Sequence, residues 1–176
     1  MQSLNDLIAA SLEAARSAQP IVSLTRLMEK TISQKEWLKQ ILPEAEEDET
    51  LLYLSDELTI YSIKLTPGVL YPPHSHGMPV VIGFYEGCET SLIFEQESGG
   101  NLRQIDRIDF DAPCVGHLEK DAIHCITNYG EITSRAIHYY LGDLVSEPRS
   151  LWNPDSMEVM PFDNGKYFEY AKPNSI

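Results

Sequence analysis

The nine residues GVLYPPHSH, from Gly68 to His76, decide how the rest of the chain is interpreted. Alternate residues of an extended segment point to the same side, so His74 and His76 can present two imidazoles to one metal ion. Thr66-Pro67-Gly68 marks a turn just before this segment. Two surface histidines beside a proline turn would give the same short pattern, so the assignment of a metal site depends on what the remaining sequence adds.

Residues 50–145 around this segment have the pattern of a mainly β domain. Short runs of alternating or β-branched residues are separated by Gly, Pro, Asp and Asn. About eight such strands at even spacing indicate a double-sheet roll or barrel, and not a fold of alternating strands and helices. The expected strands are 51–54, 58–65, 80–85, 91–95, 102–110, 114–118, 124–128 and 133–141.

The two flanking regions are expected to differ from the barrel. Residues 1–49 predict an N-terminal helical segment packed on the barrel, with Ser3 as the first N-cap and a capping box at Ser33–Glu36. Pro43 should end the last helix, and the acidic run Glu44–Glu49 is interpreted as a solvated linker. Residues 146–176 are rich in proline and predict an irregular C-terminal tail that wraps the barrel.

The composition excludes several classes of partner. Thirteen basic and 27 acidic side chains give a net charge of −14, which disfavours binding to nucleic acid or to anionic membranes. No apolar run approaches the ~18 residues of a membrane span, and the N-terminus lacks the basic region of a secretory signal. Three cysteines without framework spacing indicate reduced thiols and a cytoplasmic location.

A second segment favours the metal interpretation. His124 stands at the start of a later strand, and Asn128 follows after three intervening residues. Together with Gly68–His76, this segment resembles the two motifs of the cupin family over roughly residues 50–145. The resemblance implies a cupin double-stranded β-helix, a jelly-roll barrel, with His74, His76 and His124 as metal ligands. Many cupins add a carboxylate four or five residues after the second histidine, where this chain has Val80 and Val81.

A third segment carries the resemblance further. Ala136, His138 and Tyr140 share one face of a predicted strand, which would pair His138 with Tyr140 beside the metal. The segment is similar to the Ser-x-His-x-Tyr run of the thiol dioxygenases, the group of cysteine and mercaptopropionate dioxygenase. Ala136 replaces the serine and can orient nothing by hydrogen bonding. The resemblance extends to a bacterial branch described as predicted metal-dependent cupins, and it implies an Fe(II) site with His138 and Tyr140 as catalytic residues.

The resemblance also suggests how substrate binds. The arginine that anchors the substrate in mammalian-type cysteine dioxygenase is absent, since Ser55 takes its place. The cysteine of the family's cysteine–tyrosine crosslink is replaced by Val81, so Tyr140 should be uncrosslinked. Arg149 stands nine residues after Tyr140, where mercaptopropionate dioxygenase has its carboxylate-binding arginine. A surface arginine in a proline-rich tail is the competing interpretation.

The expected reaction is Fe(II)-dependent oxidation of a small, carboxylate-bearing thiol to its sulfinate with O₂. Two other interpretations stay open at the level of sequence. One is a cupin that uses another divalent metal for lyase, isomerase or hydrolase chemistry, because three histidines also suit zinc, nickel or manganese. The other is a non-enzymatic cupin that binds a metal or a small molecule. The chain is expected to be a monomer or a homodimer.

Overall fold

The N-terminal region is helical, as predicted. The computed structural model describes residues 3–43 and 47–174, and its first elements are α1 (Leu4–Ala15), α2 (Pro20–Ile32) and α3 (Lys35–Ile41). Ser3 is the N-cap of α1, and its hydroxyl accepts a hydrogen bond from the Asp6 amide in a capping box. The capping box predicted at Ser33–Glu36 is wrong. Ser33 ends α2, its hydroxyl donates to the Lys30 carbonyl, and α3 begins without a side-chain cap.

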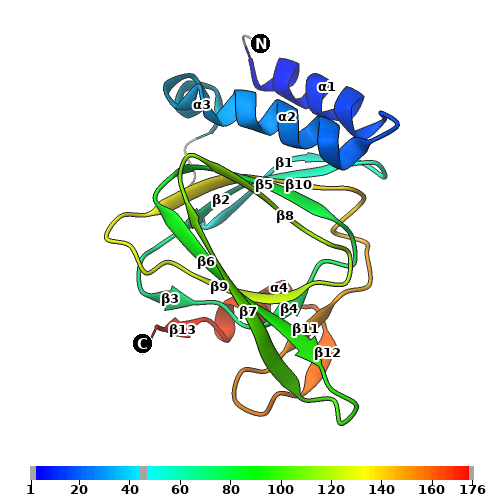
Figure 1. Ribbon diagram of the computed structural model, residues 1–176, viewed down its shortest axis with the longest axis vertical. Coiled ribbons are helices and arrows are strands. Elements are labelled where there is room, and N and C mark those ends of the chain that lie inside the picture. The colour runs from blue at the N-terminus through cyan, green and yellow to red at the C-terminus, as the bar shows by residue number, and fades with distance from the viewer. Residues whose placement is uncertain (1–2, 44–46, 175–176) are drawn as a thin grey trace.

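The first of two antiparallel sheets lies directly under these helices (Figure 1). Its strand order is β1 (Glu49–Leu54), β2 (Thr59–Leu65), β10 (Ser134–Tyr140), β5 (Val80–Glu86) and β8 (Cys114–Leu118). The outer face packs on the helices, and the inner face lines the barrel. Both faces of the sheet are therefore buried, which explains why β5 is buried along nearly its whole length. The outer cluster includes Leu24, Met28, Ile32, Val81, Ile137 and Tyr139.

Gly83 allows the helices to approach this sheet closely. A Cβ atom at Gly83 would lie 2.3 Å from the sulfur of Met28 and 2.9 Å from a methyl carbon of Ile32. Real Cβ atoms do not come so near to their neighbours, so only glycine permits this separation of α2 from β5. The fit between helix and sheet thus depends on one missing side chain in the centre of the sheet.

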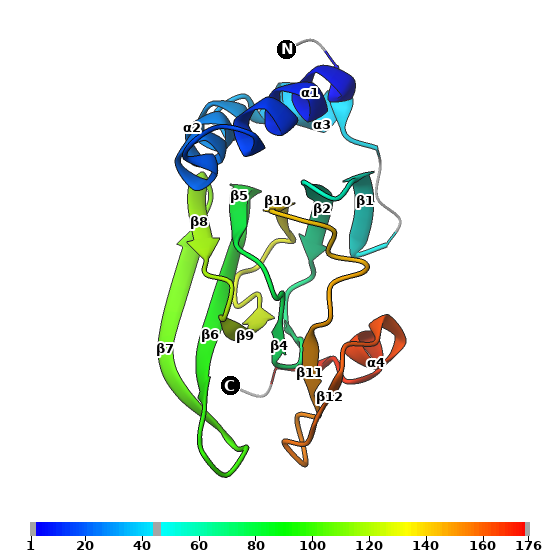
Figure 2. The ribbon, with the colours of Figure 1, turned by 90° about the vertical axis from the view of Figure 1, so that its right-hand side faces the viewer.

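The second sheet faces the first across the barrel interior, as Figure 2 shows from the side. It contains β7 (Leu102–Asp111), β6 (Cys88–Gln96), β9 (Ile123–Thr127), β3 (Val69–Leu70), β4 (His74–Ser75), β13 (Lys172–Pro173), β11 (Ser150–Trp152) and β12 (Val159–Pro161). The interior between the sheets is filled by an apolar cluster that includes Val80, Ile82, Phe84, Phe110, Leu118 and Ala136. This confirms the predicted fold class, a mainly β double-stranded β-helix with N-terminal helices. In the described residues, no helix has the length and apolar character needed to cross a membrane.

The C-terminal region differs from the prediction. It is not an irregular tail, because it contributes β11, β12, β13 and the short helix α4 (Asn164–Glu169). β11 pairs with β4, and β13 pairs with β3, so the barrel continues past residue 145. At the other boundary β1 already begins at Glu49, one residue before the predicted start of the barrel. These strands are two or three residues long and form because the second sheet offers open hydrogen-bonding edges.

Candidate metal centre and substrate pocket

The three predicted ligands meet in the second sheet. His74 of β4 pairs directly with His124 of β9 across the antiparallel ladder, and His76 follows two residues after His74. All three side chains are buried, and one nitrogen atom of each lies within 4.8 Å of the others. The turn before β3 uses Gly68 at φ +78°, a backbone conformation that favours glycine. The residues therefore form a three-histidine metal-binding site of the kind that the spacing predicts.

Hydrogen bonds orient two of the three rings, those of His74 and His124. His74 Nδ1 lies 3.0 Å from the Pro72 carbonyl, which can only accept, so Nδ1 carries the proton and Nε2 keeps its lone pair. His124 Nδ1 lies 3.2 Å from the Ser91 hydroxyl, and its Nε2 faces His76 Nε2 at 3.4 Å. Such contacts to the far nitrogen orient the rings that bind metals.

The protonation state also suits a cation. Burial lowers the pKa of His74 to about 4, and it lowers the pKa values of His76 and His124 well below their usual range. Repulsion from the neighbouring imidazoles lowers the pKa values of His76 and His124 further. The rings are thus neutral at pH 7, and their lone pairs converge on one point. A divalent metal ion fits this donor set, because it would satisfy three lone pairs that face one another in a buried space.

His138 and Tyr140 lie next to this centre. His138 Nδ1 is 3.0 Å from the Tyr140 hydroxyl, and the Tyr140 ring lies 5.1 Å from the His76 ring, centroid to centroid. Both side chains are buried. Ala136 lies two residues earlier on the same strand, and His138 Nε2 has no hydrogen-bond partner among the described residues. Among the described residues, the His138 ring is therefore hydrogen-bonded through Nδ1 alone. Burial raises the pKa of Tyr140 far above its usual value.

The two positions where many cupins have a carboxylate ligand hold valines here, and neither valine can bind a metal. Val80 belongs to the interior cluster beside Tyr140, whereas Val81 faces the helices in the outer cluster. The three cysteines, Cys88, Cys114 and Cys125, are free thiols. The centre thus has a neutral ligand set.

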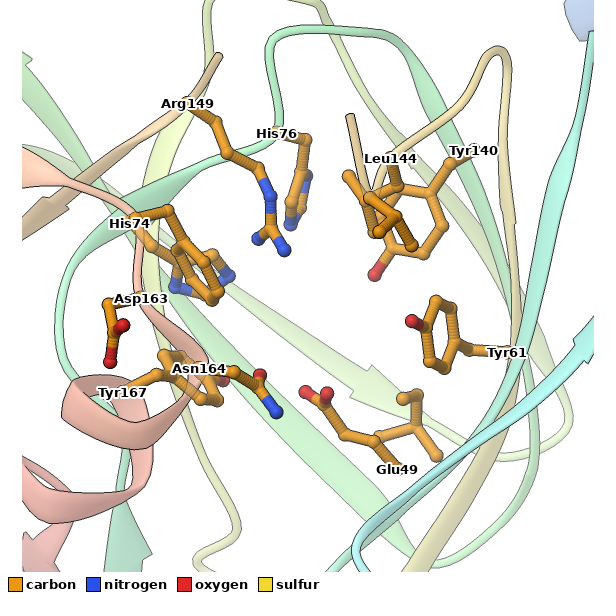
Figure 3. A pocket seen from close by; sticks show the side chains of 13 residues that line it. Glu49, Tyr61, His74, His76, Tyr140, Leu144, Arg149, Asp163, Asn164 and Tyr167 are labelled. Carbon is orange, nitrogen blue, oxygen red and sulfur yellow. The ribbon is translucent and has the colours of Figure 1, made fainter. Parts of the chain in front are cut away.

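Arg149 lines the same cavity as His74, His76 and Tyr140 (Figure 3), which has a volume of about 360 Å³. It directly precedes β11, and β11 pairs with the strand that carries His74. Its guanidinium carbon lies 3.4 Å from the centroid of the Phe162 ring, in a cation–π contact. The side chain is thus fixed by an aromatic surface while its N–H groups face the cavity.

Glu49 also lines this cavity, although its place in an acidic run indicated solvent. The acidic run was assigned to a solvated linker, and this assignment is wrong for Glu49, the first residue of β1. Its side chain is half-buried and lines the pocket, and burial raises its pKa to about 6 even though Arg149 acts to lower it. Asp48 is also engaged, since it accepts a 2.6 Å hydrogen bond from Tyr71. Residues 44–46 lie outside the described residues. The predicted strand that follows the acidic run directly could have indicated that the last acidic residue belongs to the barrel.

The C-terminal helix α4 packs against one of the ligands. The prediction of an irregular tail did not include this contact. Tyr167 of α4 is buried, and its ring lies 5.0 Å from the His74 ring in an edge-on arrangement. The same tyrosine stacks on Tyr71 at 5.1 Å. Asp163 caps α4 by accepting a hydrogen bond from the Lys166 amide. The end of the chain therefore forms one wall of the metal centre.

Two further buried residues lie on β6 behind the centre, and one of them contacts a ligand. Ser91, besides its contact with His124, is hydrogen-bonded to Glu89 on the same strand. Glu89 is almost fully buried, and burial raises its pKa to about 8. One of its carboxyl oxygens has no partner among the described residues. Nothing in the local sequence distinguished these two residues from the solvent-facing residues of a strand.

No family model matches the sequence, and no curated protein matches it significantly. A solved, uncharacterized protein with a double-stranded β-helix domain from Klebsiella pneumoniae aligns with 65% of this chain and 87% of its own, at 10% identity and a TM-score of 0.49. An RmlC-like cupin family protein from Methanocaldococcus jannaschii aligns with 59% of this chain and 90% of its own, at 12% identity and a TM-score of 0.47.

A third solved structure is the DMSP lyase DddQ from Ruegeria pomeroyi. It aligns with 58% of this chain at 19% identity and a TM-score of 0.46. The alignment covers 46% of the lyase, so this chain spans less than half the length of that protein. At identities below 20%, these likenesses concern the fold and not the chemistry of the site.

Proposed function

We propose that this protein is a non-haem Fe(II) thiol dioxygenase that oxidises a small, carboxylate-bearing thiol to its sulfinate. The observation that carries the proposal is one cavity lined by His74, His76, Tyr140 and Arg149. His124 completes the three-histidine cluster behind it, and His138 contacts Tyr140. When held by the three histidines, Fe(II) would supply the redox chemistry that lets a thiol and O₂ react at one centre. A cytoplasmic location, where thiols stay reduced, is part of the same proposal.

The proposed reaction balances without a further reductant or oxidant. Two S–O bonds form, the O–O bond and the S–H bond break, and sulfur loses four electrons to O₂. The thiol proton goes to solvent, and the product is the sulfinate anion. Both oxygen atoms enter the product, so one O₂ is consumed for each thiol.

Arg149 would hold the substrate by its carboxylate. A guanidinium offers two parallel N–H donors that match the two oxygens of a carboxylate. The Phe162 ring fixes the plane of the guanidinium and leaves its edge free. The distance from this edge to the three histidines would then select thiols of short length, because the sulfur must reach the centre while the carboxylate stays bound.

Tyr140 would donate a hydrogen bond to an oxygen atom on which negative charge develops. Burial keeps its hydroxyl protonated at every physiological pH, so it remains a donor. With its proton on Nδ1, His138 would donate to the hydroxyl oxygen across the 3.0 Å contact, which leaves the hydroxyl proton free for the developing anion. A donor placed in advance in a buried site stabilises a developing anion more than water does, because nothing has to reorient during the reaction.

The test is oxygen uptake by protein reconstituted with Fe(II), assayed with cysteine, 3-mercaptopropionate and cysteamine. We expect uptake with at least one carboxylate-bearing thiol and one equivalent of sulfinate per O₂ consumed. Protein reconstituted with zinc is the matched control, because zinc fills the same ligands and has no redox chemistry. A full complement of iron without uptake on any thiol would favour the alternative cupin chemistries.

A further inference from the structure

Two opposite charges face the pocket without a partner. The Glu49 carboxylate and the Arg149 guanidinium both line the cavity that contains His74 and His76. Among the described residues, neither side chain makes a hydrogen bond or an ion pair, and the guanidinium lies over the Phe162 ring in a cation–π contact. Other charged residues near the surface of this protein, such as Arg16 and Glu57, are paired.

The two charges do not neutralise each other directly. Figure 3 shows the guanidinium and the carboxylate pointing into the central space from opposite sides of the pocket. They are near enough for Arg149 to lower the pKa of Glu49, yet no contact within ion-pair distance joins them. The space between them opens towards the histidines and the hydroxyls of Tyr61 and Tyr140.

Such an arrangement favours a ligand that can pair with both charges. A half-buried charge has lost part of its hydration and regains the energy only through a charged or strongly polar partner. One cation and one anion on opposite sides of a pocket are complementary to a ligand with two charges. The ligand's negative group would meet Arg149, and its positive group would meet Glu49. A ligand with a carboxylate alone would pair with Arg149, but its negative charge would repel the Glu49 carboxylate.

We propose that the pocket selects a zwitterionic thiol, with Arg149 on its carboxylate and Glu49 on its ammonium group. This inference rests on the proposed function for the thiol, and it adds Glu49 as the residue that determines specificity. The substrate class is an amino acid with a side-chain thiol. Thiols that lack either charge are poor substrates, because a site built to bind a charged group rejects an analogue that leaves its own group unpaired.

The first experiment compares Glu49→Gln with the wild type on three thiols. Cysteine carries both charges, 3-mercaptopropionate lacks the ammonium group, and cysteamine lacks the carboxylate. We expect Glu49→Gln to lower kcat/KM for cysteine and cysteamine by roughly ten- to a hundred-fold, the loss of one charged hydrogen bond. The value for 3-mercaptopropionate should stay constant or rise, because the repelling carboxylate is gone.

Glu47→Gln is the matched control. It removes the same charge two residues earlier, at an exposed position that does not line the cavity. We expect no change of substrate preference in this variant. If Glu49→Gln lowers kcat/KM equally for cysteine and 3-mercaptopropionate, Glu49 acts on Arg149 or on the fold, and the inference is wrong.

The second experiment separates this inference from the proposed function. Calorimetric binding of the three thiols to Fe(II)-loaded protein under nitrogen measures charge selection without turnover. Tighter binding of cysteine than of the other two, lost in Glu49→Gln, supports the inference even if no oxygen is consumed in air. Oxygen consumption with equal binding of cysteine and 3-mercaptopropionate overturns the inference and leaves the proposed function intact. Binding of none of the three overturns the inference.

Discussion

His74 and His124 are direct partners in the β4–β9 ladder, and their imidazole centroids lie 4.6 Å apart. They stand 50 positions apart in the chain, and one antiparallel register brings them together. Since the backbone fixes the spacing of these two rings, two of the three ligands are built into the sheet, and His76 follows directly after β4.

Replacing His74, His76 or His124 by alanine should remove most of the bound metal. Each variant leaves two neutral imidazoles, which bind a divalent ion much more weakly than three. Elemental analysis after reconstitution should give one metal ion per chain in the wild type. His117→Ala is the control, because His117 is exposed on β8 and lies outside the cluster. Equal metal content in all four variants would refute the ligand assignment.

Tyr140→Phe should retain the metal and lose turnover. The substitution removes one positioned donor, for which a reduction of roughly ten- to a thousand-fold is expected. The rate of oxygen uptake at saturating thiol is the measurement. Tyr139→Phe serves as control, because Tyr139 is the next residue and points to the helices in the outer cluster. Loss of metal in Tyr140→Phe would instead make the tyrosine part of the ligand shell.

Arg149→Ala should chiefly weaken the use of thiols that carry a carboxylate. We expect a loss in kcat/KM of roughly ten- to a hundred-fold for 3-mercaptopropionate, and nearly none for cysteamine. Arg149→Lys should rescue only part of the loss, since an ammonium group lacks the planar fork. If Arg149 only holds the C-terminal region against the barrel, kcat/KM will fall equally for all thiols, and the Tm will fall as well.

Glu89→Gln should change how stability depends on pH. The buried carboxyl has its pKa raised from 4.5 to about 8, so the folded protein keeps a proton that the unfolded chain releases. The stability contributed by Glu89 is complete below about pH 4.5 and is lost as the pH rises towards 8. The wild type should therefore lose about 3 kcal/mol relative to Glu89→Gln between pH 4 and pH 7. Urea unfolding at several pH values measures the difference, and parallel curves would contradict the prediction.

Gly83→Ala should destabilise the fold without altering the site. The added methyl group would overlap Met28 and force α2 away from β5, at a cost of about 1–3 kcal/mol. Gly99→Ala is the control, because a Cβ there meets no atom within 4 Å. Thermal unfolding measures the loss. Metal content should equal that of the wild type, since His74 and His124 lie on the second sheet and His76 directly follows β4.

The sequence by itself determined the barrel and its metal centre. Alternating residues between turn signals fixed eight strands within a few positions, because a strand with a buried face must repeat every second residue. The spacing of His74 and His76 placed two rings on one side for the same reason. These are local properties of an extended chain, and they can be read without knowing what lies opposite.

Only the tertiary structure decided which distant groups share the pocket. Glu49 follows an acidic run that by itself indicates solvent, and only the position of β1 at the mouth of the barrel turns its side chain inward. Tyr167 lies in a region whose prolines indicated an irregular tail, yet the open edges of β3 and β4 order that region and place the tyrosine against His74. Strands of two or three residues have too little sequence for a periodic pattern. They form because neighbouring strands offer unpaired backbone groups, and that cause is not local.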